Sequence, residues 1–253
     1  MKCPICGGEH PDDVQICTNT GEQLKKMCLN RDCSYYRERI FGLDMDTCPC
    51  CGRLLFTTPH EYVDLGLSVK WAKYNVGADD SNEGSLFAWG SLVPNCSYSK
   101  KEEYNCEVGH CYIQPDEDIA TKEWGDYWRI PTRGEWEELI SSCDLEWVHI
   151  CGMEFVVRLT SRINGESIIL PVCGFIKGCK RQYQRDMACY WSSSADDDNY
   201  SANCFCFSRS EYKPYVHISQ YSEYRGVAFS IRPVFGKRPS TSIPWKRLKE
   251  IFK

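Results

Sequence analysis

In one segment of the chain, apolar residues recur with the spacing of an amphipathic helix. Between residues 131 and 140 they are spaced three or four apart, and Glu135 stands three residues after Thr132. This pattern predicts a helix with Thr132 as N-cap, Glu135 completing a capping box, and a buried stripe formed by Trp136, Leu139 and Ile140. A second, shorter helix is expected over about residues 118–124.

Elsewhere apolar and polar residues alternate over short stretches separated by Gly, Asn and Asp, which is typical of strands. Residues 63–71 predict a strand or a hairpin, and further strands are expected at 155–159, 168–171, 204–207, 215–218 and 227–231. The alternation places Phe205 and Phe207 on one face of their strand, and Cys204, Cys206 and Ser208 on the other. Val216 and Ile218 are likewise expected to point inward, and His217 and Ser219 outward.

Composition is that of an ordinary globular protein except for one residue type. Hydrophobic residues make up 42% and charged residues 26%, and no apolar run approaches the roughly 18 residues of a membrane span. The chain starts without an apolar secretory signal, so we expect a soluble, cytoplasmic protein. In such a protein 18 Cys beside 5 His favour metal sites over disulfides. The net charge of −5 argues against nucleic-acid binding by the whole chain.

Four cysteines near the N-terminus have the spacing of a zinc ribbon. Cys28 and Cys33 form one pair, and Cys48 and Cys51 form the second, followed by Gly52. Two such pairs close a tetrahedron around Zn²⁺, and glycine suits the tight turn after the last ligand because it tolerates a positive φ. A set of free buried thiols is the alternative. Cys50 lies between two ligands and is expected to be a spare thiol.

A partial copy of the same pattern of zinc ligands precedes these residues. Cys3, Cys6 and Cys17 occupy three ligand positions, and Thr20 stands where the fourth cysteine is expected. Three alternatives remain open: His10 completes a site of three cysteines and one histidine, another group or water does so, or the metal has been lost.

Residues 1–56 resemble the tandem zinc ribbons found at the start of many prokaryotic proteins, which implies a small docking module whose folding energy comes from Zn²⁺. With 7 basic and 8 acidic side chains, this part is better suited to protein contact than to nucleic acid. A linker follows at 57–60, a larger domain at 61–236 and a tail at 237–253. The tail holds 6 basic and 1 acidic residues and predicts a short amphipathic helix, which is expected to contact its own acidic domain. A partner groove, a membrane or nucleic acid are the alternatives.

A series of short sequence motifs gives the larger domain a resemblance to a known family. They are EYVDLGLSVKWA at 61–72, NVGA at 75–78, FAWG at 87–90, WRIPT at 128–132, EWEEL at 135–139, YWSSS at 190–194 and SIRPV at 230–234. In this order they resemble the Fibrobacter succinogenes major paralogous domain, which is abundant in Bacteroidetes. The resemblance implies an α+β fold of the C-type-lectin-like kind, related to the formylglycine-generating enzymes, with a twisted antiparallel sheet and ligand-binding loops. Most such domains bind without catalysing.

The shared residues also have a simple structural interpretation. Five tryptophans are expected in the core because indoles bury large areas: Trp71, Trp89, Trp128, Trp136 and Trp191. Arg129 and Arg232 stand beside apolar residues and prolines, which favours a structural ion pair or a clamp on backbone carbonyls over contact with a ligand.

The segment 196–225 is the expected ligand face. Its outward side chains are rich in Tyr, Ser, Cys and His, which make adaptable recognition surfaces. The candidate ligand-binding residues are Cys204, Cys206, Ser208, Tyr212, Tyr215, His217, Tyr221 and Tyr224. A polar strand edge with solvated tyrosines is the alternative.

The domain also resembles the variable proteins of diversity-generating retroelements, in which adenine mutagenesis of Asn codons rewrites surface residues. Cys204, Ser208, His217 and Tyr221 are reachable from such codons, as are most residue types, whereas Lys, Glu, Gln, Met and Trp are not. The resemblance therefore implies a receptor whose segment 196–225 varies.

Catalysis has little support in the sequence, and we expect no catalytic residues. Walker, G-x-G-x-x-G and H-E-x-x-H motifs are absent, and the ten cysteines after residue 90 are scattered. Gln114-Pro115-Asp116 matches a sugar-selecting tripeptide of calcium-dependent lectins, but the partner strand motif is missing. We therefore expect a non-enzymatic binding protein with Zn²⁺ and an unknown protein or peptide ligand. A formylglycine-generating-type enzyme and a purely structural interaction module are the alternatives.

Overall fold

The computed structural model describes two compact units, Met1–Glu61 and Tyr62–Lys253. In the first unit it describes residues 25–28, 34, 40–42, 45, 47–52, 55–56 and 60. From residue 61 onward it describes 61–78, 83–98, 111–125, 127–150, 153–178, 180–198, 200–209, 216–236 and 238. Of the tail, only Arg238 therefore belongs to the described residues.

The described part of the first unit is a small antiparallel sheet of three strands. Its order is β2-β1-β3, with β1 at Lys25–Cys28, β2 at Ile40–Gly42 and β3 at Leu55–Phe56. β1 pairs with both neighbours, and β3 follows directly after the segment that contains Cys48 and Cys51.

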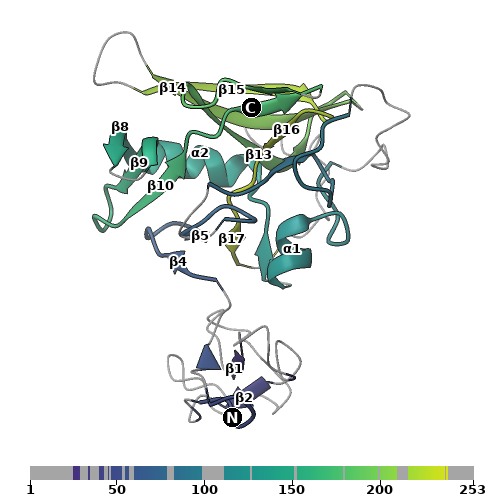
Figure 1. Cartoon of the computed structure of the whole chain (residues 1–253). Coiled ribbons are helices and arrows are strands. Elements are labelled where there is room, and N and C mark those ends of the chain that lie inside the picture. The colour runs from purple at the N-terminus through teal and green to yellow at the C-terminus, as the bar shows by residue number, and fades with distance from the viewer. Residues whose placement is uncertain are drawn as a thin grey trace, which may run out of the picture. The chain divides into compact units, whose positions relative to one another are not determined.

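The second unit is built around a seven-stranded sheet in the order β12-β11-β16-β13-β14-β15, with β6 also paired to β16 (Figure 1). The strands are β6 Leu86–Ala88, β11 Phe175–Lys177, β12 Lys180–Gln182, β13 Met187–Ala195, β14 Ser201–Arg209, β15 Val216–Tyr224 and β16 Ala228–Ser230. The sheet curls strongly: Lys177 Nζ of β11 lies 3.6 Å from Glu223 Oε1 of β15, although three strands separate β11 from β15 in the order.

Two smaller sheets complete this unit. One has the order β10-β9-β8, with β8 at Cys143–Ile150, β9 at Met153–Ser161 and β10 at Ser167–Pro171. The other has the order β4-β5-β17-β7, with β4 at Tyr62–Val63, β5 at Lys70–Ala72, β7 at Trp128–Arg129 and β17 at Val234–Phe235. The last strand, β17, thus pairs with β5 near the start of the unit and with β7 from its middle.

The two helices begin where the sequence predicts. α2 spans Arg133–Ser142, with Thr132 as N-cap and the full capping box to Glu135. α1 spans Ile119–Trp124, and its N-cap Asp118 accepts hydrogen bonds from the backbone N–H groups of Ala120 and Thr121. Each cap satisfies donors that the first helical turn leaves unpaired.

The core lies between α2 and one face of the large sheet. Trp136 is fully buried and stacks on Phe205 with ring centroids 5.4 Å apart, and Tyr190 and Phe207 pack beside it. The five tryptophans expected in the core are each at most 1% exposed. Val216 and Ile218 pack against the same cluster, as the alternation predicts. Burial of these large rings is the main stabilising term for the unit.

Arg129 and Arg232 are buried and have the structural roles that the sequence favours. Arg129 is 2% exposed and forms a bidentate pair with Glu135, at 2.8 Å to Oε2 and 2.5 Å to Oε1. Arg232 is 1% exposed and donates to the backbone carbonyls of Ala72 at 2.9 Å and Ile169 at 2.6 Å, and also to that of Lys73. Arg232 therefore fastens the β10-β9-β8 sheet to the end of β5.

The structure is mostly β, with antiparallel and mixed sheets and two short described helices. It contains two long strands that the sequence did not predict, β8 and β13. Among the described residues, no helix is both long and apolar enough to cross a membrane.

Candidate functional site

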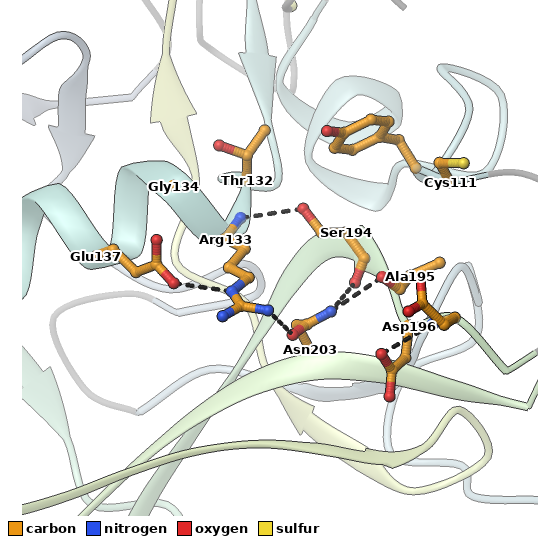
Figure 2. A pocket seen from close by; sticks show the side chains of 11 residues that line it. Cys111, Thr132, Arg133, Gly134, Glu137, Ser194, Ala195, Asp196 and Asn203 are labelled. Atoms are coloured by element: carbon orange, nitrogen blue, oxygen red, sulfur yellow. Dashed lines mark hydrogen bonds and ion pairs between the residues drawn. The ribbon is translucent and has the colours of Figure 1, made fainter. Parts of the chain in front are cut away.

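A pocket of about 300 Å³ opens between the start of α2 and the end of the β13–β14 hairpin (Figure 2). α2 and its cap contribute one wall, through Thr132, Arg133, Gly134 and Glu137. The hairpin contributes the opposite wall, with Ser194, Ala195, Asp196, Asp197 and Asn203. Cys111 and Tyr112 complete the lining, and Tyr112 is bridged to Ser194 as a short antiparallel contact.

The backbone at the start of α2 is held against the hairpin by a hydrogen bond. The backbone N–H of Arg133 donates to Ser194 Oγ at 3.1 Å. A side chain at Gly134 would meet no atom within 4 Å, so the pocket reaches the helix backbone there without obstruction. The positive end of the helix dipole thus faces this space, which favours a negatively polarised group of a ligand.

Arg133 is the central side chain of the pocket. Its Nε donates to Glu137 Oε1 at 2.8 Å and its Nη1 to Asn203 Oδ1 at 3.3 Å (Figure 2). Although partial burial opposes it, hydrogen bonds from Arg133 and Gln220 hold the pKa of Glu137 below its usual value. The guanidinium is therefore fixed between two acceptors, while its side chain remains 40% exposed and able to contact a ligand.

Asn203 links the two strands of the hairpin at the floor of the pocket. It is 6% exposed, and its Nδ2 donates to the carbonyl of Ala195 at 2.9 Å. The register between β13 and β14 shifts between Trp191 and Ala195, and the amide of Asn203 bonds to the backbone within that irregularity. Local loss of regular pairing is what makes backbone groups available at this end of the hairpin.

An acidic turn forms the rim opposite Arg133. Asp196 accepts from the backbone N–H of Asp197 at 2.8 Å, and Asp198 accepts from those of Tyr200 at 2.8 Å and Ser201 at 2.5 Å. Slight burial opposes it, but these backbone hydrogen bonds hold the pKa of Asp198 below its usual value. Asp196 and Asp197 make one end of the pocket acidic, while at the other end the Arg133 guanidinium is paired with the carboxylate of Glu137 beside the helix start.

The expected ligand face is placed differently from the sequence prediction. Cys204 and Cys206 share a face of β14 as predicted, but their expected exposure is wrong: they are 0% and 1% exposed. The curl of the sheet and the Tyr221 side chain bury them, with Tyr221 Oη 3.4 Å from Cys206 Sγ. Phe205 and Phe207 pack in the core on the other face, as predicted.

The remaining residues of the expected ligand face differ in their exposure to solvent. His217 is exposed and Tyr221 is 37% exposed, while Ser208 and Tyr224 are half-buried. Tyr212 and Tyr215 lie outside the described residues. Of the expected set, none lines the pocket described above, because the pocket is on the opposite side of β14.

The described cysteines of the first unit form a tight turn. The backbone N–H of Gly52 donates to the carbonyl of Cys48 at 2.8 Å, and Gly52 has a φ of +70°, as the sequence predicts. Cys48 is buried, Cys51 is half-buried, and the exposed Cys50 lies with its Sγ 3.3 Å from Ser34 Oγ. This turn suits a pair of metal ligands with Cys50 pointing elsewhere.

The other candidate ligands cannot be placed beside this turn. Cys33, Cys3, Cys6, Cys17 and His10 lie outside the described residues, and for Cys28 only the backbone strand is described. In the described part of the chain no group of three or more His, Cys, Asp or Glu side chains is arranged so that it could hold a metal ion.

Sequence reasoning missed the pocket residues, although one signal pointed toward them. The capping box fixes Arg133 and Gly134 at the first turn of a helix, where backbone donors face outward. What the sequence did not reveal is that Ser194 and Asn203, sixty or more residues later, close over that turn.

A scan against protein-family models, a search of curated proteins and a search of solved structures each gave no match to this chain.

Proposed function

We propose that this chain is a non-enzymatic binding protein whose second unit recognises a protein or peptide ligand at the pocket between α2 and the β13–β14 hairpin. The observation that carries this proposal is that two different structural elements line the pocket. One is a rigid helix start with Arg133 and Gly134, and the other is a hairpin end with Asn203 and an acidic turn.

The charges of the pocket favour a peptide segment as ligand. The helix start and Arg133 offer donors to carbonyl or carboxylate oxygens, and Asp196 and Asp197 offer acceptors to amide or ammonium groups. A peptide carries both kinds of group at short spacing. Its affinity would come from backbone hydrogen bonds at both ends of the pocket.

Part of the pocket belongs to the segment 196–225, for which the resemblance to diversified receptors implies variation. Asp196, Asp197 and Asn203 fall inside it, whereas Arg133 and Gly134 fall outside. We infer a C-type-lectin-like domain that presents changeable residues beside a constant anchor. The exposed His217 and Tyr221 would then form a second changeable surface on the other side of β14.

The first unit is proposed to be a zinc-dependent docking module. The turn at Cys48–Gly52, with its positive φ, supports this interpretation for the pair Cys48 and Cys51. The module would hold a partner protein in the cytoplasm while the second unit meets the ligand.

The enzyme alternative gains little from the cysteine pair of β13 and β14. Cys189 and Cys206 lie side by side, but they are 0% and 1% exposed and do not line the pocket. Without access to the pocket, these thiols cannot attack a substrate bound there. Binding therefore remains the function that the geometry supports best.

The test uses peptides selected from a random displayed library against the full chain. Arg133→Ala is expected to weaken binding of the selected peptides by at least about tenfold, because hydrogen bonds to a charged group are lost. Arg158→Ala is the matched control, since Arg158 is also 40% exposed and paired to a glutamate, but lies on β9 away from the pocket.

Calorimetric titration measures the dissociation constants, and circular dichroism verifies that both variants are folded. Equal affinity of Arg133→Ala and Arg158→Ala for every selected peptide would place recognition elsewhere on the chain. A selection that yields no binder would contradict the peptide proposal itself.

A further inference from the structure

Three thiols gather on the face of the large sheet that turns away from α2. Cys189 comes from β13, and Cys204 and Cys206 come from β14. All three are at most 1% exposed and free of disulfides. They belong neither to the pocket nor to the N-terminal ribbon.

The register singles out one pair among the three. Cys189 is directly opposite Cys206, whereas Cys204 is opposite Trp191. Directly opposed residues in an antiparallel pair have Cα atoms about 4.5–5.5 Å apart, which lies inside the range that a disulfide spans. Cys204 and Cys206 are two positions apart along one extended strand, about 7 Å, which is too far.

Cys206 has close neighbours on its own face of the sheet. Tyr221 Oη lies 3.4 Å from Cys206 Sγ, and the Cys204 thiol donates to the backbone carbonyl of Tyr221 at 3.3 Å. Burial opposes ionisation of Cys206, but hydrogen bonding with Cys189, Cys204 and Tyr221 lowers its pKa, while the pKa values of Cys189 and Cys204 are raised. Of the three thiols, Cys206 is therefore the one whose surroundings favour the thiolate.

Access to the pair is restricted to small molecules. The two sulfurs are buried, and Tyr221, which contacts Cys206, is itself only 37% exposed. Hydrogen peroxide is close to water in size and can enter through small fluctuations of this side chain. A bulky disulfide such as oxidised glutathione cannot reach either sulfur without opening the sheet.

We propose that Cys189 and Cys206 are a site of oxidation by hydrogen peroxide, which joins them in a disulfide between β13 and β14. The Cys206 thiolate attacks a peroxide oxygen, the O–O bond breaks, and the sulfenic acid of Cys206 forms as hydroxide leaves and takes up the released proton. The Cys189 sulfur then attacks the sulfenic sulfur, and the S–O bond breaks as water leaves with the Cys189 proton. Two thiols and one peroxide give one disulfide and two waters.

The bond would form within the hairpin that holds the pocket. β13 carries Ser194 and β14 carries Asn203, both within the register shift that follows the regular pairing of the thiol-bearing part. A disulfide between Cys189 and Cys206 keeps the two strands from separating and so holds Ser194 and Asn203 in register. The site is independent of whether the pocket binds a peptide.

The experiment treats the reduced full chain with hydrogen peroxide, alkylates the remaining thiols and maps the peptides. Chymotrypsin cuts after Tyr190, Phe205 and Phe207, which places the three cysteines in separate peptides. The expected product links the Cys189 peptide to the Cys206 peptide, with Cys204 alkylated. Cys204→Ser is the matched control and keeps the link, whereas Cys189→Ser loses it.

The exposed Cys111 reports that the oxidant has acted. If Cys111 is oxidised while Cys189 and Cys206 are both recovered alkylated, the proposal is overturned. A bond between Cys204 and either partner would overturn it as well, because the register predicts a single pairing.

Discussion

Replacing Arg232 by methionine is expected to lower the free energy of unfolding by about 3–5 kcal/mol. The guanidinium is 1% exposed and donates to the carbonyls of Ala72, Lys73 and Ile169. Methionine fills a similar volume but leaves these buried acceptors without donors, and each unsatisfied group costs about 1–3 kcal/mol. Burial lowers the pKa of Arg232, and the three carbonyls offset the cost of the buried guanidinium by accepting its hydrogen bonds.

Urea unfolding followed by tryptophan fluorescence measures this loss. Arg158→Met is the matched control, because that side chain is 40% exposed and its pair with Glu146 is at 3.6 Å; a change within about 1 kcal/mol is expected for it. Equal effects of the two substitutions would show that the clamp contributes no more than a surface ion pair.

Replacing Cys51 by serine is expected to remove one zinc ion per chain and to unfold the first unit. A fragment of this size buries little surface, so zinc bound at the proposed site would supply most of its folding free energy. Cys50→Ser is the matched control, because Cys50 is exposed, contacts Ser34 and is not one of the proposed zinc ligands. It is expected to leave the zinc content unchanged.

Elemental analysis of the purified chain measures the zinc content directly. The intact chain is expected to hold one zinc where only the site of Cys48 and Cys51 is filled, and two where His10 or another group completes the first ribbon. Identical zinc content in Cys50→Ser and Cys51→Ser would contradict the assignment of ligands.

Local signals in the sequence were sufficient for the elements whose structure depends on neighbouring residues. The capping box at Thr132 and Glu135, the positive φ of Gly52 and the two-sided strand around Phe205 and Phe207 all follow from short spacings. The carbonyl clamp of Arg232 also followed, because a charged residue among apolar ones must be paired if it is buried.

Features that depend on distant segments were missed. β13 contains three consecutive serines, which weakens its apolar signal, yet Ser192 and Ser193 are buried between paired strands. The burial of Cys204 and Cys206 results from the curl that brings β11 to β15, which no alternation within one strand reveals. The pocket likewise arises from contacts between Arg133 and Asn203, seventy residues apart.

Sequencing this gene across a population of cells tests the proposal that the second unit presents changeable residues on a constant scaffold. Codons for Asp196, Asp197, His217 and Tyr221 are expected to vary at adenine-derived positions. Phe205 and Phe207 are expected to stay constant because they are in the core, and Gln220 and Glu223 because Asn codons cannot give them. An invariant segment, or substitutions as frequent at Phe205 and Phe207 as at His217 and Tyr221, would contradict it.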